Sequence, residues 1–352
     1  MRLTLVLICY NRLNMNTNNL QIKEKTPQIL AEIKKAKSVL LHCHPSPDPD
    51  SVGSALAMKF VVEQLGVKAT VIRGDSDIPQ AFMHFPGAED ILMKNYWEID
   101  PNDYDLFIIV DSDLTGVSRL EVVKQVPESM TIINIDHHRT NGGFGKINIT
   151  EPSYPATGQL LYDIFSEMGV KITPEIAANL FIGIFSDTGG FKYEGVNSAT
   201  FEIAGQLIKI YPEFSKLIAQ MENSNSLTDL KFRALALNSV EAVLDNKMLI
   251  SVITYNEIAK NNIPDVSISA GMISPILRTV FGYDLFASII EPRPNQIKVS
   301  FRTIDANKYD VSKLASSIGG GGHKAAAGAV LNMPIEEAKS LVVSKVKELY
   351  NL

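Results

Sequence analysis

Four short apolar runs in the first half of the chain predict buried strands. They cover residues 38–43, the region around Thr70, residues 105–110 and residues 131–135. Such runs, rich in β-branched side chains and bounded by polar turns, are typical of a parallel sheet covered on both faces. Residues 174–185 instead repeat apolar side chains with helical spacing. The pattern therefore predicts an α/β fold with a doubly wound, mostly parallel sheet and helices between its strands.

The second half of the chain predicts a separate, smaller α/β domain. Residues 213–243 are helical in pattern with a break at 224–226, and an amphipathic helix follows Pro334. Three strands are predicted between them, the last two joined as a hairpin: residues 248–254, 285–290 and 296–301. We therefore divide the chain into an N-terminal extension, a first α/β domain, a helical linker and a second α/β domain: residues 1–25, 26–212, 213–246 and 247–352.

Polar side chains follow one of these strands at the point where it ends. Asp136, His137 and His138 come directly after the run at 131–135. In open α/β sheets the carboxyl ends of the strands meet at the ligand crevice. A carboxylate and two imidazoles at that place can bind a divalent metal and still leave one imidazole for a substrate. Taken alone, such a tripeptide is more often a satisfied polar cluster at a strand end.

A second set of candidate ligands follows the first predicted strand. His44, Asp48 and Asp50 lie in a proline-rich segment, and Ser51 after them is a candidate helix cap. The prolines are expected to exclude helix and to hold the segment extended, so that the three side chains converge on one point. A surface turn is the alternative interpretation of this segment.

Two further aspartates complete the pattern. Asp111 follows the strand at 105–110, and Asp187 follows the helical run at 174–185. A capping aspartate or a simple turn would explain either of them alone. Because four apolar elements in succession end in Asp or His, the sequence predicts a metal site built from all four ends.

The composition narrows the class of protein. A chain of 352 residues has room for two domains with their own cores. Its hydrophobic fraction of 45% and charged fraction of 20% are typical of a globular protein, and no segment has the apolar length of a membrane span. The net charge of −6 argues against long duplex nucleic acid as a partner, because such binders concentrate Lys and Arg. A short oligonucleotide or a nucleotide remains compatible, since bound divalent cations add positive charge at the site.

Cys9 and Cys43 are the only cysteines, so a disulfide framework is not expected and a reducing cytoplasm is the default location. Strand alternation places Cys43 on the face opposite His42 and His44, and we interpret it as a small buried hydrophobe. His42 either supports the site from behind His44 or is a packed histidine.

In this arrangement the chain resembles the DHH phosphoesterase family. The candidate ligands described above stand at the four motifs of that family. Far downstream, residues 317–329, with four glycines before His323, resemble the glycine-rich signature of the DHHA1 domain. The resemblance extends from about Ala31 to the C-terminus. By layout, the chain is most similar to the two-domain enzymes of the nanoRNase type, which are related to RecJ and to proteins named exopolyphosphatase-related.

The resemblance implies a role for each candidate ligand. Two divalent cations would share bridging carboxylates, and each cation would be completed by one further pair of ligands. The bridging residues would be Asp111 and Asp187, the first pair His44 and Asp48, and the second pair Asp50 and His137. Mixed carboxylate and imidazole ligands favour Mn²⁺, with Mg²⁺ or Co²⁺ as alternatives.

Two residues of the third motif would act without binding metal. His138 would contact the phosphate and stabilise its developing charge, and Asp136 would fix an imidazole tautomer from behind. One departure concerns the first motif, where the family commonly has a glycine and this chain has Pro49. Proline cannot copy a positive-φ glycine, so the resemblance leaves the position of Asp50 open.

The second domain would bind the substrate. Gly320, Gly321 and Gly322 would let backbone N–H groups approach an anion closely, and His323 and Arg302 would add charge and hydrogen bonds. A flexible loop and a solvated strand residue are the alternative interpretations of these positions.

The resemblance thus implies hydrolysis of short oligoribonucleotides or of adenosine 3′,5′-bisphosphate by a water that two metals activate. Hydrolysis of cyclic di-adenylate or of its linear product pApA is the alternative. Polyphosphate or pyrophosphate hydrolysis is less favoured, and a non-enzymatic nucleotide-binding protein least of all. No membrane partner is expected, and homo-oligomerisation is left open.

Overall fold

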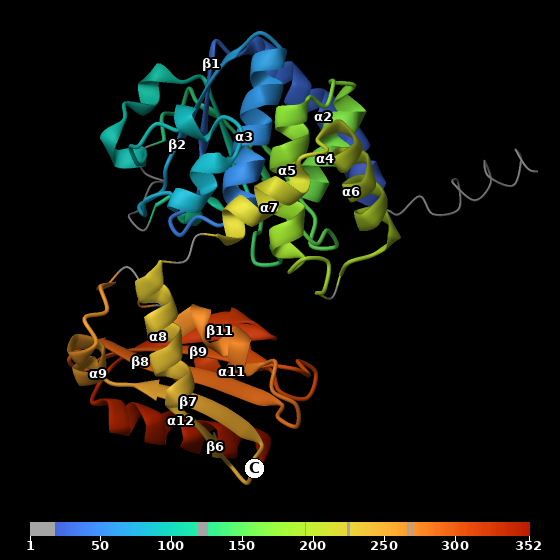
Figure 1. Cartoon of the computed structure of the whole chain (residues 1–352). Coiled ribbons are helices and arrows are strands. Elements are labelled where there is room, and N and C mark those ends of the chain that lie inside the picture. The colour runs from blue at the N-terminus through green and yellow to red at the C-terminus, as the bar shows by residue number, and fades with distance from the viewer. Residues whose placement is uncertain (1–17, 119–125, 194, 224–225, 266–267, 269) are drawn as a thin grey trace, which may run out of the picture. The chain divides into compact units, whose positions relative to one another are not determined.

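The computed structural model describes residues 18–118, 126–193, 195–223, 226–265, 268 and 270–352. Contacts within the chain divide it into two compact units, residues 1–224 and 225–352 (Figure 1). Most of the predicted N-terminal extension, through residue 17, lies outside the described residues, and its last residues belong to helix α2 (Asn18–Lys35). Every described helix is too short or too polar to cross a lipid bilayer.

Unit 1 is built on a five-stranded sheet in the order β2-β1-β3-β4-β5, and all neighbouring strands are parallel. The strands are β1 (Ser38–His42), β2 (Lys68–Ile72), β3 (Leu106–Val110), β4 (Thr131–Asp136) and β5 (Ile147–Thr150). The four predicted strands are present. The sequence analysis missed β5, a four-residue edge strand in which isoleucines alternate with polar residues.

Successive residues of the strands face opposite layers of unit 1. Val39 and Leu41 pack into a large core with the helices, whereas Leu40 packs into a smaller core on the other face. The helices of the unit are α2, α3 (Pro49–Gln64), α4 (Thr157–Met168), α5 (Pro174–Asp187), α6 (Ser198–Ile210) and α7 (Phe214–Glu222). On the smaller face, a 3₁₀ turn at Tyr96–Glu98 stacks Tyr96 on Phe107 of β3 at a centroid distance of 5.9 Å. This two-sided cover confirms the predicted α/β class.

The start of helix α3 differs from the prediction. Asp48 caps the helix, because its Oδ1 accepts a 2.9 Å hydrogen bond from the backbone N–H of Ser51. Pro49 is the first helical residue, a position that suits proline because the N–H it lacks would have no partner there. The interpretation of Ser51 as the cap was therefore wrong: its Oγ accepts from the backbone N–H of His44 at 3.0 Å. The extended segment ends at Asp48, and Asp50 lies in the first turn of the helix.

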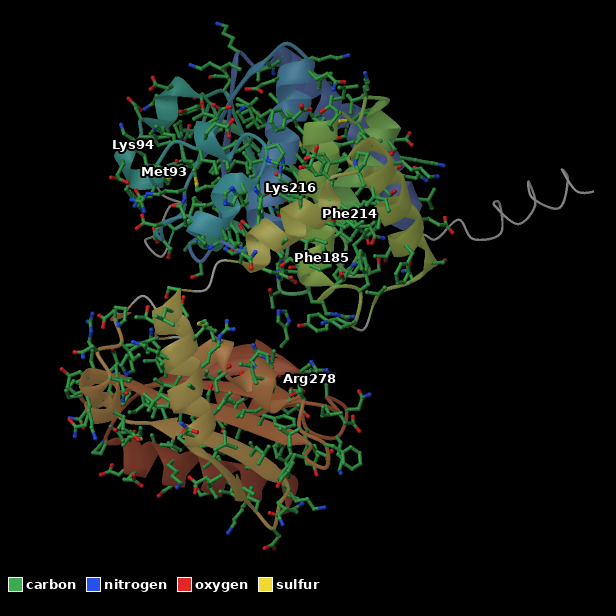
Figure 2. The ribbon with its side chains drawn as sticks, viewed as in Figure 1. Met93, Lys94, Phe185, Phe214, Lys216 and Arg278 are labelled. Carbon is green, nitrogen blue, oxygen red and sulfur yellow. The ribbon has the colours of Figure 1, made fainter. Side chains whose placement is uncertain are left out.

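Helices α3 and α5 pack together at very short range in the core of unit 1. A Cβ atom on Gly53 of α3 would lie 2.5 Å from the carbonyl oxygen of Asn179 on α5, so glycine permits this approach. Farther along α5, Phe181 packs edge-on against Phe214 of α7 at 5.3 Å, and Figure 2 marks Phe185 and Phe214 in this aromatic region. The contacts fix the C-terminal end of α5, where Asp187 lies.

Unit 2 contains a six-stranded mixed sheet in the order β10-β11-β9-β8-β7-β6, in which β7 and β8 are the parallel pair. The strands are β6 (Val240–Val243), β7 (Met248–Ile253), β8 (Leu285–Arg293), β9 (Gln296–Thr303), β10 (Gly321–His323) and β11 (Ala326–Asn332). The helices are α8 (Leu227–Asn238), α9 (Tyr255–Lys260), α10 (Ser274–Leu277), α11 (Val311–Ser316) and α12 (Ile335–Tyr350). The predicted hairpin and the terminal helix are both present.

Two segments of the second half differ from their predictions. Val240–Val243, taken as helical, forms strand β6 and pairs antiparallel with β7. Gly321–His323, expected to lie in a loop, forms strand β10 and pairs with β11. Gly319, at φ +83°, makes the turn before that strand. Of the two helices in the predicted linker, α7 falls in unit 1 and α8 in unit 2.

Candidate metal centre

The structure brings all six predicted metal ligands together in unit 1. Three groups of side chains place their ligand atoms within 4.8 Å of one another: His44, Asp48 and Asp111; Asp50, His137 and Asp187; and Asp111, His137 and His138. The first two groups contain the two sets of ligands that the resemblance assigned to separate cations. The ligands come from the ends of β1, β3 and β4 in one layer and from α3 and α5 in the other.

Asp111 lies between the two halves of the cluster. It is almost fully buried, and its Oδ2 lies 3.8 Å from Nε2 of His44, while its Oδ1 lies 3.6 Å from Nε2 of His137. Its backbone has φ +58°, a left-handed conformation that aspartate tolerates better than most side chains. The backbone N–H of Asp111 still donates to the carbonyl of Ile135 at 3.0 Å, so the turn is tied to the end of β4.

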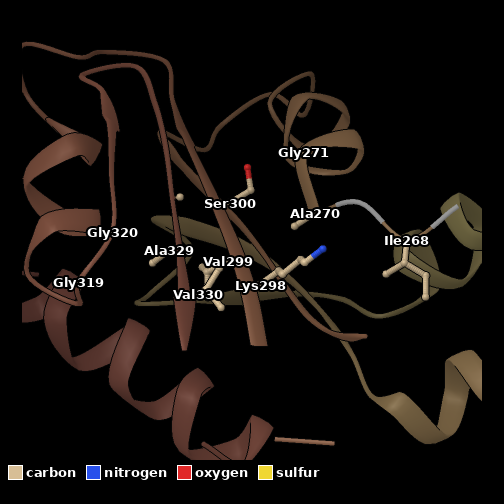
Figure 3. A pocket seen from close by; sticks show the side chains of 11 residues that line it. Ile268, Ala270, Gly271, Lys298, Val299, Ser300, Gly319, Gly320, Ala329 and Val330 are labelled. Atoms are coloured by element: carbon tan, nitrogen blue, oxygen red, sulfur yellow. The ribbon is translucent and has the colours of Figure 1, made fainter. Parts of the chain in front are cut away.

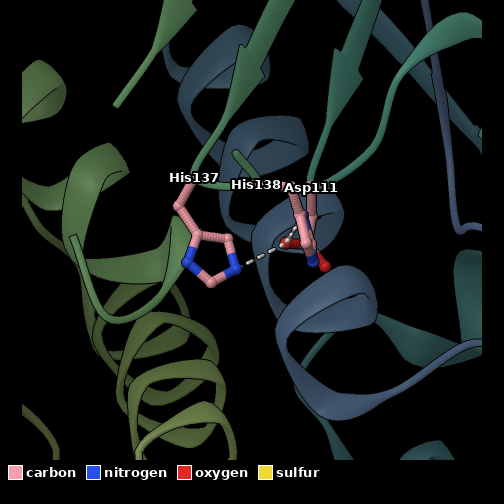
Figure 4. A group of neighbouring side chains, drawn as sticks. All are labelled: Asp111, His137 and His138. Carbon is pink, nitrogen blue, oxygen red and sulfur yellow. Dashed lines mark ion pairs between the residues drawn. The ribbon is translucent and has the colours of Figure 1, made fainter. Parts of the chain in front are cut away.

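His137 has the geometry of a metal ligand. Its Nδ1 lies 3.1 Å from the carbonyl oxygen of Tyr154, an acceptor, so Nδ1 carries the proton and Nε2 presents a lone pair. That Nε2 is buried and has no hydrogen-bond partner among the described residues, and it lies 3.2 Å from Oδ2 of Asp187. Figure 4 shows the imidazole directed toward Asp111. An unsatisfied buried nitrogen facing carboxylates fits a bound cation.

Asp50 is held in place by the N-terminus of helix α4. Its Oδ2 accepts from the backbone N–H of Thr157 at 2.7 Å, and its Oδ1 accepts from the backbone N–H of Gly158 at 2.9 Å. The partial positive charge of a helix N-terminus stabilises a carboxylate there. Gly183 of α5 leaves room for this carboxylate, because a Cβ atom on Gly183 would collide with Oδ1 of Asp50. The carboxylate of Asp50 is thereby positioned although Pro49 stands where the family commonly has glycine.

His44 and Asp48 form the other side of the cluster. Oδ1 of Asp48 caps helix α3, which leaves Oδ2 to face Nε2 of His44 at 3.4 Å. Burial alone would lower the pKa of His44, but the neighbouring Asp48 carboxylate raises it above its usual value. One carboxylate oxygen therefore does a structural task while the other remains directed into the site.

His138 is held in place by hydrogen bonds to Asp136. Oδ1 of Asp136 accepts from both the backbone N–H of His138 at 3.1 Å and its Nδ1 at 2.7 Å, and Oδ2 accepts from the amide of Asn141 at 2.7 Å. Asp136 is therefore the carboxylate behind the ring of His138, whereas the carbonyl of Tyr154 lies behind the ring of His137. Because Nδ1 is hydrogen-bonded to Asp136, Nε2 is the ring nitrogen of His138 on the side away from that carboxylate.

Burial and neighbouring charges shift the pKa values within the cluster. Burial, with the Asp187 carboxylate as the next cause, raises the pKa of Asp50 to about 7. Burial and the Asp50 carboxylate raise the pKa of Asp111 well above its usual value. Burial alone would lower the pKa of His137, but the facing Asp187 and Asp50 carboxylates raise it to about 9. A divalent cation would neutralise the carboxylates that cause these shifts.

A pocket of about 340 Å³ lies against one side of this cluster. His44, Asp111, Asp136 and His138 line it together with residues that the sequence analysis did not select, among them Ser112, Thr140 and Asn141. Asn141 could have been selected, because it lies three residues after His138. Thr157 gave no signal in the sequence, although its hydroxyl donates to Oδ1 of Asp111 at 2.9 Å.

His42 and Cys43, next to the first motif, are both fully buried. Cys43 belongs to the large core of unit 1, and burial raises its pKa to about 12, which confirms the interpretation as a small hydrophobe. His42 faces the other layer, where its ring packs edge-on against Phe107 and its Nε2 lies 3.3 Å from Oγ of Ser112. Burial lowers the pKa of His42 to about 4, so the ring is neutral.

The predicted substrate-binding residues lie in unit 2. Arg302 of β9 is paired with Ala326 of β11, which is paired with His323 of β10. Directly paired residues of neighbouring strands point to the same face of a sheet, so Arg302 and His323 project from one face. Nη1 of Arg302 donates to Oγ of Ser300 at 3.2 Å and to the carbonyl of Phe301 at 2.8 Å.

Comparisons with known proteins agree with this arrangement. Over 324 residues the chain is 26% identical to a bifunctional oligoribonuclease and PAP phosphatase NrnA of Thermus thermophilus, which covers 91% of this chain and 93% of that protein. A protein of the same name from Bacillus subtilis is 24% identical over 311 residues, covering 86% of this chain and 92% of that protein.

Solved structures show the same fold. An exopolyphosphatase-related protein from Bacteroides fragilis has a TM-score of 0.84 at 23% identity, and the match covers 94% of this chain and 98% of that one. RecJ of Thermus thermophilus in complex with Mn²⁺ has a TM-score of 0.56 at 13% identity, covering 94% of this chain and 55% of that one.

Two family profiles match the sequence itself. The N-terminal domain of the DHH family matches residues 38–184, which contain every predicted metal ligand except Asp187. The DHHA1 domain matches residues 245–351, which contain Arg302 and the glycine-rich segment. The chain therefore belongs to the DHH family and combines the N-terminal domain of that family with a DHHA1 domain.

Proposed function

We propose that this protein is a metal-dependent phosphoesterase that hydrolyses short oligoribonucleotides and adenosine 3′,5′-bisphosphate. The observation that carries the proposal is the pair of ligand groups around Asp111, with His138 beside them and held by Asp136. The family and the names of the NrnA relatives support the choice of bond and of substrate. In this proposal residues 26–212 form the catalytic domain, 213–246 the linker and 247–352 the substrate-binding domain.

The ligand set fits two divalent cations. Asp111 and Asp187 are proposed to bridge them, with His44 and Asp48 on one side and Asp50 and His137 on the other. Two such cations neutralise phosphate charge and supply a nucleophilic water at neutral pH. Oxygen ligands mixed with imidazole suit Mn²⁺, with Mg²⁺ or Co²⁺ as alternatives. The crystal structure of RecJ from Thermus thermophilus with Mn²⁺ is in keeping with this choice.

The residues of the chain have separate tasks in this proposal. Asp136 keeps the proton of His138 on Nδ1 and so fixes the direction of Nε2. When the ring carries a proton on both nitrogens, Nε2 of His138 donates to a phosphate oxygen and stabilises the charge that develops on it. Asp50 and Asp111 are positioned by Thr157, and His137 is oriented by Tyr154.

Unit 2 is proposed to hold the substrate. The guanidinium of Arg302 can bind a phosphate with charge-assisted hydrogen bonds, and His323 projects from the same face of the sheet. Because β10 is a strand at this place, Gly321 and Gly322 contribute an open strand edge with no bulky side chain, and Gly320 lies in the turn before it.

A substrate panel with Mn²⁺ tests the proposal. Two- to five-nucleotide RNA and adenosine 3′,5′-bisphosphate should be hydrolysed, and pApA, cyclic di-adenylate and tripolyphosphate are the competing substrates. A preference for cyclic di-adenylate or pApA would favour the signalling alternative, and a preference for tripolyphosphate would contradict the nucleotide assignment. If nothing is hydrolysed with Mn²⁺, Mg²⁺ or Co²⁺, the enzymatic proposal fails.

A further inference from the structure

Strand β9 in the sheet of unit 2 carries a row of polar side chains on one face. On β9, Lys298, Ser300 and Arg302 point to the same face, because strand residues two apart share a face. On the opposite face, Val299 and Phe301 belong to the core. This face of the sheet, where it is formed by β7 and β8, packs into a second core. That core includes Phe232 of α8 and Phe286 of β8.

The register of the strands arranges this face in three rows. The first row contains Arg302 and His323, which are the proposed phosphate-binding residues. The middle row pairs Ser300 with Gly328, and Gly328 with Gly321, so it carries only small side chains. The third row pairs Lys298 with Val330. The row with Arg302 and the row with Lys298 therefore lie on either side of a row of small side chains. Four strand residues separate Arg302 from Lys298, a distance of about 13 Å.

A pocket of about 500 Å³ lies at the Lys298 end of this face (Figure 3). It is lined by the backbone and side chains of eleven residues, which include Lys298, Ser300, Val330 and the glycines at 319 and 320, and none of the eleven is acidic. Figure 3 shows the Lys298 side chain extending across the pocket toward Ala270 and Ile268. The volume of the pocket is within the range of sites for ligands of nucleotide size.

Lys298 is the free cation of this pocket. It is exposed, and its ammonium group makes no ion pair or hydrogen bond with another described residue. Val330, directly across from it on β11, exposes 57% of its surface and offers an apolar contact beside the charge. Ser300 is different, because its Oγ is buried between Oγ of Ser274 at 2.9 Å and Nη1 of Arg302 at 3.2 Å. That chain of hydrogen bonds fixes Arg302 and leaves Lys298 to bind a ligand.

We propose that the Lys298 pocket is a second nucleotide subsite, which binds the part of an oligonucleotide beyond the phosphate held by Arg302 and His323. This inference rests on the proposed function. Lys298 contacts a backbone phosphate, and Val330 contacts the adjoining sugar or base. The small residues of the middle row let the chain of the ligand pass between the two charged rows. The subsite therefore favours oligonucleotides of about three nucleotides and longer over adenosine 3′,5′-bisphosphate.

The experiment compares Lys298→Gln with the wild type on 5′-phosphorylated tri- and tetranucleotides and on adenosine 3′,5′-bisphosphate. Loss of one charge-assisted phosphate contact should lower the ratio of kcat/KM for the trinucleotide over that for the bisphosphate by about tenfold. Val330→Asp places a carboxylate opposite Lys298 at an exposed position and should lower the same ratio. Lys347→Gln is the matched control, because Lys347 is an exposed lysine of α12.

A binding measurement makes the result independent of catalysis. Fluorescence anisotropy of a labelled trinucleotide, with the metals removed by a chelator, should show weaker binding to Lys298→Gln than to Lys347→Gln. The slope of log affinity against log salt concentration should also be smaller by about 0.7, as expected for one lost contact to single-stranded phosphate. Equal ratios and equal slopes in the two variants would overturn the subsite and leave the proposed function standing. Failure of the proposed function would instead appear as a wild type that hydrolyses no substrate, and the anisotropy would still decide the subsite.

Discussion

The hydroxyl of Thr157 donates a 2.9 Å hydrogen bond to Oδ1 of Asp111. The backbone N–H of the same residue donates to Oδ2 of Asp50 at 2.7 Å. One residue at the start of helix α4 therefore positions two carboxylates that come from the sheet layer and from α3. Neither carboxylate has a lysine or arginine among its hydrogen-bond or ion-pair partners in the described part of the chain.

Thr157→Val should weaken metal binding by about 10–100-fold, which is the usual effect of removing a hydrogen-bond partner from behind a metal ligand. Thr157→Ser keeps the hydroxyl and should stay near the wild-type affinity. Calorimetric titration of the metal-free protein with Mn²⁺ measures both variants. Equal affinities for the valine and serine variants would show that the Thr157 hydroxyl does not support the site.

His138→Ala should retain metal and lose most activity, by about 10²–10³-fold, because the ring is proposed to stabilise charge on the phosphate and not to bind a cation. Asp187→Ala should lose metal as well as activity, since the Asp187 carboxylate faces Nε2 of His137. Metal content measured after gel filtration, together with kcat, separates the two roles. Equal loss of metal from both variants would contradict the role of His138.

Asp136→Asn tests whether Asp136 holds the ring of His138 in place. The amide can no longer accept with both of its terminal atoms, so one of the contacts to His138 or Asn141 is lost. We expect kcat to fall by about 10–100-fold while metal affinity changes little. Asn141→Ala should give a smaller loss of the same kind. A large loss of metal in Asp136→Asn would indicate that Asp136 acts on the cations directly.

Gly183→Ala should disturb the site from inside the core, because the added methyl group would meet Oδ1 of Asp50. We expect about 1–3 kcal/mol of destabilisation together with weaker metal binding. Gly53→Ala is the control, since its methyl group would meet the carbonyl of Asn179 and not a ligand. Chemical denaturation and Mn²⁺ titration of both variants check the prediction: Gly53→Ala should lower stability alone.

The stability of the metal-free protein should decrease between about pH 6.5 and pH 9. The folded-state pKa of His137 is raised from 6.5 to about 9, so over this range the folded state holds more protons than the unfolded state. Asp50, whose pKa is raised from 3.8 to about 7, adds to this difference only up to about pH 7. Stability then falls as pH rises, and the contribution of His137, fully present below pH 6.5, is lost as pH passes through 9. His42, with a lowered pKa of about 4, acts in the opposite direction only below pH 6.5. Melting temperatures with chelator should fall over the range, and Mn²⁺ should abolish the trend.

The sequence predicted which side chains gather in the cluster, because each of them follows an apolar element whose end can be recognised in the sequence. Asp111 and the residues of the third motif needed only the rule that strand ends meet at one edge, whereas Asp187 ends a helix. The supporting residues depend on tertiary contacts: Thr157 reaches Asp111 across the fold, and no local pattern marks it. The carbonyl of Tyr154 belongs to the backbone, so no side chain could have pointed to it.

Local predictions failed where the segment could adopt two conformations of similar free energy. Pro49 was taken to exclude helix, but proline at the first helical position loses no hydrogen bond. Gly321 and Gly322 have low strand propensity, yet pairing with β11 holds them in a strand. The Asp48 cap supports the first conformation, and pairing with β11 supports the second.

The ligands of the cluster come from two layers, with β1, β3 and β4 on one side and α3 and α5 on the other. Cations bound there would act as a removable cross-link between sheet and helices. The layers could then separate only after the ions had left, so ion release would become part of the barrier to unfolding. The lifetime of the native state against a protease, and not only its equilibrium stability, would therefore depend on the concentration of free metal.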